Sequence, residues 1–165
     1  MSAKAFWSWP VTEWGVMGFC AWSAADLLAA WRSAPMDRGG WMAMAIWLAP
    51  LIGWRWRARE AAAPPRVSFL LAGLGGALLC RLTDLNAAGY AGLAVALAAW
   101  MPGGWRTWWW LAGAVAWMPV FGWALTGLTA FWVLPGRLLL AVAASLPAVR
   151  LSRLRAPNSV SLVEP

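Results

Sequence analysis

The residues able to do chemistry are few in this sequence, and their types limit the reactions it can support. The 165 residues include no histidine, which removes the commonest general base and the commonest ligand of transition metals. The two cysteines, Cys20 and Cys80, lie inside apolar runs and lack the Cys-x-x-Cys or Cys/His spacing of zinc and iron–sulfur sites. We therefore expect no metal, no cofactor and no catalytic residue, with both cysteines serving as small apolar core side chains.

The most polar group within an apolar run is the stretch 80–86, CRLTDLN. Arg81 and Asp84 are three residues apart, so on a helix they share a face and can pair. The simpler interpretation is a snorkelling arginine with its counter-ion at the outer end of a helix. The alternative is a polar site at the outer leaflet, to which an outer loop and the first apolar run contribute. The predicted polar cluster consists of Arg81, Asp84, Asn86, Asp37, Arg38 and Asp26, the last as a second candidate partner for Arg81.

Small residues recur along the same run at steps of three and four. Gly73, Gly76 and Ala77 are followed by Cys80 and Asp84 on this spacing. Such a stripe lets another helix backbone approach closely. We expect it to pack within one helical bundle, with an oligomer interface as the alternative.

The composition favours a membrane protein. The sequence is 62% apolar and 12% charged, about half the charged fraction of an average soluble domain. Its thirteen basic residues lie in short clusters between apolar runs and form no continuous basic face, so binding to nucleic acid is not expected.

Six apolar runs predict an all-α, polytopic integral membrane bundle over residues 1–150, with about six transmembrane helices, followed by a cytoplasmic, disordered tail over 151–165. An open sheet cannot satisfy its backbone in lipid, and the runs are too continuous for barrel strands. Five spans is the alternative, because Glu13 and Asp26 interrupt the first run. The runs are Val11–Trp31, Gly40–Trp54, Val67–Leu85, Ala87–Met101, Trp108–Leu128 and Ala130–Val149.

The basic residues and the seventeen tryptophans agree on one orientation. Basic clusters follow the second, fourth and sixth runs, which predicts that both termini are cytoplasmic in a bacterial cytoplasmic (inner) membrane. Nine basic residues are then inside, and Arg32, Arg38 and Arg137 are outside. Most tryptophans mark the membrane boundaries: Trp7, Trp9, Trp54, Trp56, Trp105 and Trp108 to Trp110 inside, and Trp31, Trp41 and Trp132 outside. An interface role does not explain Trp22, Trp47, Trp117 and Trp123, which fall within the runs.

Three features between Trp31 and Trp123 together suggest a family. They are the segment 33–40 (SAPMDRGG) before an apolar helix, an arginine-rich turn over 55–66 with two adjacent prolines, and a Trp-Met-Pro segment at 117–119 within an apolar helix. In these features the chain resembles the N-terminal half of the exosortase/archaeosortase family of polytopic membrane transpeptidases. That family's Ala-Cys-Ser-Gly-x-Arg motif is absent and Cys80 stands in Leu-Leu-Cys-Arg-Leu-Thr, so no active-site residue is carried over.

Two functions follow as hypotheses. The first is a non-catalytic structural or accessory subunit of a membrane complex, whose partners are the lipid bilayer and other membrane proteins. The second is an exosortase-like cysteine transpeptidase, or a degenerate relative of one, with Cys80 as nucleophile and Arg81 assisting. A small transporter is less favoured, because the runs show no inverted repeat and no ionisable residue near the bilayer midplane.

Overall fold

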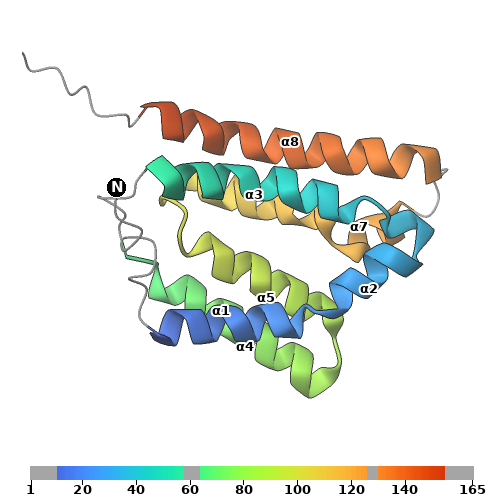
Figure 1. Ribbon diagram of the computed structural model, residues 1–165, viewed down its shortest axis with the longest axis horizontal. Helices are drawn as coiled ribbons and strands as arrows, with labels where there is room; N and C mark the ends of the chain where they lie inside the picture. Colours follow the sequence, from blue (N-terminus) through green and yellow to red (C-terminus); the bar gives the residue numbers. More distant parts are fainter. Residues whose placement is uncertain (1–10, 58–63, 126–129, 155–165) are drawn as a thin grey trace, which may run out of the picture.

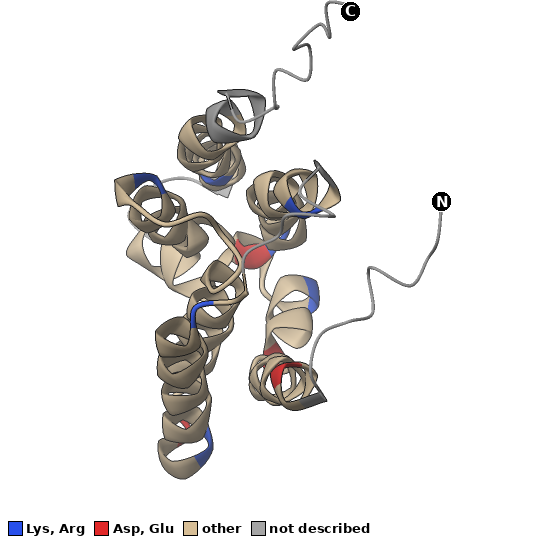
Figure 2. Cartoon of the chain, turned by 90° about the vertical axis from the view of Figure 1, so that its left-hand side faces the viewer, with Lys and Arg blue, Asp and Glu red and all other residues tan. Residues whose placement is uncertain are grey.

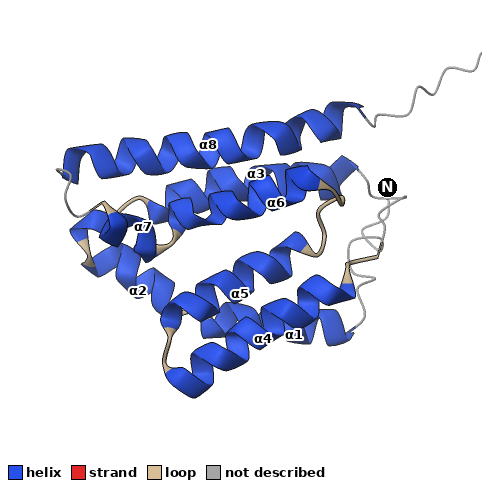
Figure 3. Cartoon of the chain, turned by 180° about the vertical axis from the view of Figure 1, so that it is seen from behind, coloured by secondary structure: helices blue, strands red, loops and turns tan. Residues whose placement is uncertain are grey.

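The computed structural model describes residues 11–57, 64–125 and 130–154, and all regular structure within these ranges is helical (Figure 1, Figure 3). The predicted all-α class is therefore confirmed. The elements are α1 (Val11–Ser23), α2 (Asp26–Ser33), the 3₁₀ turn η2 (Pro35–Asp37), α3 (Gly40–Arg57), α4 (Val67–Thr83), α5 (Asn86–Ala98), α6 (Trp105–Ala112), the 3₁₀ turn η3 (Gly113–Trp117), α7 (Pro119–Ala124) and α8 (Ala130–Leu154).

The helices form two tiers that meet at one end of the molecule. In Figure 1 and Figure 3, α3, α6 and α8 form one tier and α1, α4 and α5 form the other. The closest helix pairs are α3 with α8 and α4 with α5, each within its own tier. At the right-hand end of Figure 1, α2 rises from the end of α1 and approaches α7, so it links the two tiers.

The first predicted run is two helices and not one. α1 ends at Ser23 and α2 begins at Asp26, although the sequence between them holds no glycine or proline. Side chains of α4 bind the last carbonyls of α1: Arg81 Nη2 donates to the Trp22 carbonyl (2.7 Å), and Cys80 Sγ donates to the Ser23 carbonyl (3.5 Å). These contacts from another helix fix where α1 ends.

The fifth predicted run is broken into α6, η3 and α7, and its residues 126–128 lie outside the described ranges. Proline is the local cause, because the residue before a proline is disfavoured in the α-helical region. Met118, which precedes Pro119, is extended (φ −76°, ψ 146°). Pro119 then starts α7, where its missing N–H is not needed.

Buried side chains donate hydrogen bonds to four carbonyls in and beside the break, two of which, those of Trp110 and Met118, also accept a backbone N–H. In a low-dielectric interior an unpaired carbonyl costs several kcal/mol, so these bonds stabilise the break. The donor and acceptor pairs are Trp47 Nε1 to the Trp110 carbonyl (2.6 Å), Trp31 Nε1 to the Trp117 carbonyl (3.0 Å), and Arg137 Nη1 to the carbonyls of Ala116 (3.0 Å) and Met118 (3.2 Å).

The small-residue stripe of α4 lies against α5. A Cβ added at Gly73 would lie 2.8 Å from the Gly92 carbonyl oxygen, and one added at Gly76 would lie 2.9 Å from that of Ala88. Ala77 is fully buried beside the same contact. The structure thus places Gly73, Gly76 and Ala77 in a contact within the chain.

One helix in the described ranges, the Phe131–Val149 part of α8, is long and apolar enough to cross a bilayer by length and composition, with a mean hydropathy of 1.6. α4 and α5 are apolar but shorter. The predicted count of six spans therefore stays a prediction.

Candidate functional site

A buried ion pair lies where the two tiers meet. Arg137 of α8 is 0% exposed, and its Nη2 donates to Oδ1 of Asp37, whose side chain is 11% exposed. Its other terminal nitrogen, Nη1, donates to two carbonyls of the broken segment. This one guanidinium therefore joins α8, η2 and the segment that contains η3 and α7.

Local structure places Asp37 at this point. Pro35 begins η2, and Gly39 has a φ of +87°, a conformation that favours glycine, so that the chain can turn from η2 into α3. Gly122 of α7 leaves room for the pair, because a Cβ there would lie 2.7 Å from Asp37 Oδ1 and 2.9 Å from Arg137 Nη2. Burial raises the pKa of the Asp37 carboxyl above its ordinary value, and the Arg137 guanidinium opposes that rise.

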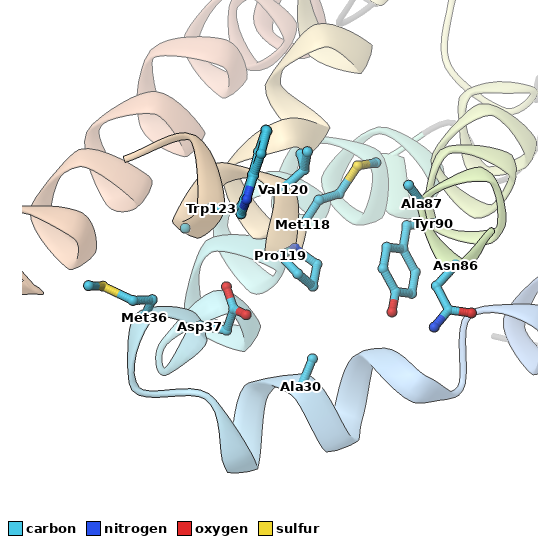
Figure 4. Close-up of a pocket in the computed structure, with 11 residues that line it drawn as sticks. Ala30, Met36, Asp37, Asn86, Ala87, Tyr90, Met118, Pro119, Val120 and Trp123 are labelled. Atoms are coloured by element: carbon cyan, nitrogen blue, oxygen red, sulfur yellow. The ribbon is translucent and has the colours of Figure 1, made fainter. Parts of the chain in front are cut away.

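A cavity of about 540 Å³ opens beside Asp37 (Figure 4). Its volume falls in the range of small-molecule sites, roughly 300–1,000 Å³. Most of its wall is apolar, and three side chains add polar groups: Asp37, Asn86 and Tyr90. The lining residues come from α2, η2, α5 and the α7 region: Ala30, Met36, Asp37, Asn86, Ala87, Tyr90, Met118, Pro119, Val120, Gly122 and Trp123.

The structure brings part of the predicted polar cluster together and places the rest elsewhere. Asp37 and Asn86 line the cavity, as a polar site at this end of the molecule requires. Arg38, Arg81, Asp84 and Asp26 are exposed and do not line it.

The predicted pair of Arg81 and Asp84 is not formed. The alternative pair of Arg81 and Asp26 is not formed either; Asp37, the buried aspartate, pairs with Arg137 instead. Asp84 follows the end of α4 with a φ of 53°, and this left-handed conformation takes it off the helical face that carries Arg81. Arg81 instead stacks on the Trp22 ring, with its Cζ 3.7 Å from the ring centroid.

The cysteines lie away from the cavity. Cys20 and Cys80 are both buried and are not paired with each other. The Cys80 thiol donates to the Ser23 carbonyl, and Arg81 binds the neighbouring carbonyl. The described residues that line the cavity include no serine, threonine, cysteine or lysine.

Sequence reasoning missed Arg137 and Tyr90. We expected Arg137 only as an orienting charge on the outer side, whereas the structure shows its side chain fully buried and paired with Asp37. A signal was present, since a single charge within a long apolar run indicates a buried partner. Tyr90, the sole tyrosine, carried no comparable signal.

Charged residues of both signs are sparse along the helices, as Figure 2 shows.

Comparison with protein-family models, with curated proteins and with solved structures found no match.

Proposed function

We propose that this chain is a multi-pass protein of the bacterial cytoplasmic membrane, with six spanning segments and cytoplasmic termini, that acts as a non-catalytic accessory subunit of a membrane complex. The distribution of side chains supports the membrane setting, because the outer surface carries many large apolar side chains that a water-soluble bundle would seldom expose together. Large apolar side chains face outward, among them Leu82 (83% exposed) and Phe131 (76% exposed). The interior holds many alanines together with an ion pair, as in helix packing within lipid.

The strongest support for a membrane setting comes from α8. Only a third of the residues in its most apolar stretch are buried within the chain, whereas a core helix of a soluble protein is mostly buried. At about 1.5 Å per residue, its 25 residues reach about 37 Å, longer than the hydrocarbon core of a bilayer. Its outward side chains include Phe131, Trp132, Leu139, Val142 and Leu146.

The other proposed spanning segments are shorter, and they need help from the residues at their ends to cross the hydrocarbon core. α4 and α5, with 17 and 13 residues, reach about 26 and 20 Å, so local thinning of the bilayer or interfacial side chains must complete the crossing. The six segments alternate in direction along the chain, with α2 after α1 and with α6, η3 and α7 in series. This arrangement supports a six-span topology.

The accessory role rests on the outward face of α1. Gly15, Gly18, Ala21 and Ala25 form an exposed small-residue stripe at steps of three and four, and nothing lies within 4 Å of a Cβ added at either glycine. The small residues of α4 pack against those of α5, whereas the glycines of the α1 stripe have no described atom packed against them. A helix from another chain is the partner that a small-residue stripe fits in a membrane.

Matched leucine substitutions test the proposal. Gly18→Leu fills the α1 stripe, and Gly75→Leu makes the same change on α4, where an added Cβ again meets nothing within 4 Å. After mild extraction of the full chain from its native membrane, we expect the unchanged chain and Gly75→Leu to elute with a second chain in fixed ratio, and Gly18→Leu to elute alone. An unchanged chain that elutes alone would overturn the accessory role. A Gly18→Leu variant that keeps the partner would overturn the assignment of this face.

A further inference from the structure

Three polar groups of the cavity have hydrogen-bonding capacity that the chain does not use. Arg137 contacts only Oδ1 of Asp37, and within the described ranges no donor contacts Oδ2. The side chains of Asn86 and Tyr90 likewise make no hydrogen bond to the described part of the chain. All three belong to the wall of one cavity; Asp37 and Tyr90 are buried and Asn86 is exposed, so a molecule in the cavity can reach these groups.

The geometry places these groups around one space. Figure 4 shows Asp37 on one side of Pro119, and Tyr90 and Asn86 on the other, so the cavity has polar groups at two places in its wall. Apolar side chains continue the wall beyond this space, namely Met36, Met118, Val120 and Trp123. The cavity therefore has a polar part and a larger apolar part.

The charge of the site selects among headgroups. Arg137 already balances the charge of Asp37, so a cationic head would bring an uncompensated charge into a mainly apolar cavity. An anionic head would face the carboxylate. A hydroxyl avoids both penalties, because it is neutral and can either donate to Asp37 Oδ2 or exchange hydrogen bonds with the phenol of Tyr90 and the amide of Asn86.

We propose that this cavity binds a neutral, membrane-soluble molecule whose headgroup is a hydroxyl and whose apolar chain lies along Met118, Val120 and Trp123. The broken segment beside the cavity fits such a site, since non-helical backbone at membrane depth is tolerated where it is buried or lines a cavity. The same chemistry occurs in glycerides and in isoprenoid alcohols. The proposal does not depend on the partner chain discussed above.

Photolabelling of the purified full chain in liposomes tests it. The probe is a medium-chain alcohol with a diazirine at the end of its chain, and matched probes carry a hydrogen, a carboxylate or a trimethylammonium group in place of the hydroxyl. Mass spectrometry locates the label. We expect the alcohol alone to label peptides that contain Met118 to Trp123, where the end of its chain would lie. Competition with dioctanoylglycerol and with geranylgeraniol then identifies which source of the hydroxyl binds more tightly.

Two variants connect the label to the named groups without disturbing the ion pair. Tyr90→Phe and Asn86→Ala each remove one hydrogen-bonding group, and we expect about three- to tenfold weaker labelling by the alcohol, the effect of one lost hydrogen bond. Thr83→Ala is the control, because the Thr83 hydroxyl donates to the Leu79 carbonyl on α4 and does not line the cavity. Each variant is compared only if it has the elution volume and the melting temperature of the unchanged chain, so that weaker labelling does not come from misfolding.

The outcomes separate the alternatives. Equal labelling of the cavity by the alkane and the alcohol would overturn the proposal, as would stronger labelling by the trimethylammonium or carboxylate probe. Labelling by the alcohol that Tyr90→Phe and Asn86→Ala both leave unchanged would also overturn it. Because the assay uses the isolated chain, failure of the accessory role leaves these results interpretable.

Discussion

At the scale of single residues, the ion pair of Asp37 and Arg137 is the contact whose loss costs the most. Removing one member of a buried pair strands the other charge, which costs about 3–5 kcal/mol. We therefore expect Asp37→Leu and Arg137→Met each to lower the free energy of unfolding in detergent by about that amount. The double variant should lose less than the sum of the two, because it leaves no unpaired charge.

Arg38→Met is the matched control for this cycle. Arg38 is adjacent in sequence but exposed, so its replacement should change the unfolding free energy by less than about 0.5 kcal/mol. Additive losses in the double variant would mean that Asp37 and Arg137 stabilise the fold independently and not as a pair.

Two buried tryptophans form the second residue-scale contact. The rings of Trp47 and Trp110 are stacked at 3.9 Å between centroids, and each indole N–H donates to the other residue's carbonyl, at 2.6 and 2.7 Å. Trp47→Phe keeps an aromatic ring at this position but removes one donor to a buried carbonyl and leaves space where the indole was, so we expect a loss of about 1–3 kcal/mol by chemical denaturation. Trp41→Phe, at an exposed position, should be nearly neutral, and an equal loss in both variants would contradict the assigned hydrogen bonds.

The tryptophans also show how far residue types alone predict position. Trp41, Trp105 and Trp132, which we expected at the membrane boundaries, are exposed as that role requires. Trp31 and Trp110 were expected there too, but they are buried, and each indole donates to a carbonyl. Their acceptors, the carbonyls of Trp117 and Trp47, are set by tertiary packing, which the sequence spacing around Trp31 and Trp110 does not encode.

At the scale of elements, the α4–α5 hairpin depends on backbone contact through glycine. A Cβ added at Gly92 would lie 2.7 Å from the Gly73 carbonyl oxygen and 2.9 Å from the Ala77 nitrogen. Because these are backbone atoms, Gly92→Ala must separate the helices, and we expect a loss of about 1–3 kcal/mol in thermal or denaturant unfolding.

Gly75→Ala, on the same hairpin, is expected to have the opposite effect on stability. An added Cβ there meets nothing within 4 Å, and alanine is favoured over glycine within a helix by about 0.5–1 kcal/mol. We expect this variant to be slightly more stable than the unchanged chain. Destabilisation by both substitutions would show that the glycines of the α4–α5 hairpin serve flexibility and not close packing.

The helices were predictable from the sequence where their signal lies in the residues of the helix itself or next to it. Apolar runs gave α3, α4, α5 and α8 to within a few residues at most ends, and Pro119 is a local signal for the break that we did not use. The break after Ser23 has no such signal, because it depends on Cys80 and Arg81 reaching α1 from α4. The cavity arises where η2, α5 and α7 meet, so only its Asp37 and Asn86 were anticipated.

At the scale of the whole molecule, the two ends differ in charge and in construction. The ion pair, the cavity and the link between the tiers lie at the end where α2 and α7 approach each other. Arg55, Arg66 and Arg106 lie at the opposite end, where α3 ends and α4 and α6 begin. The sequence assigns nine basic residues to this end and Arg32, Arg38 and Arg137 to the other, and basic residues favour the cytoplasmic side, so we predict that the cavity faces away from the cytoplasm.

Labelling of single cysteines from outside the cell tests that orientation. Cys20→Ala and Cys80→Ala remove the two buried thiols, after which Ser33→Cys, Gly103→Cys or Ser2→Cys adds one reactive site. With six spans, a membrane-impermeant maleimide should label Ser33→Cys in intact cells, and should label Gly103→Cys and Ser2→Cys only after lysis. If the first segment lies along the surface and five segments cross, Ser2→Cys becomes accessible from outside while the other two keep their pattern. Labelling of Gly103→Cys in intact cells would instead reverse the orientation and place the cavity on the cytoplasmic side.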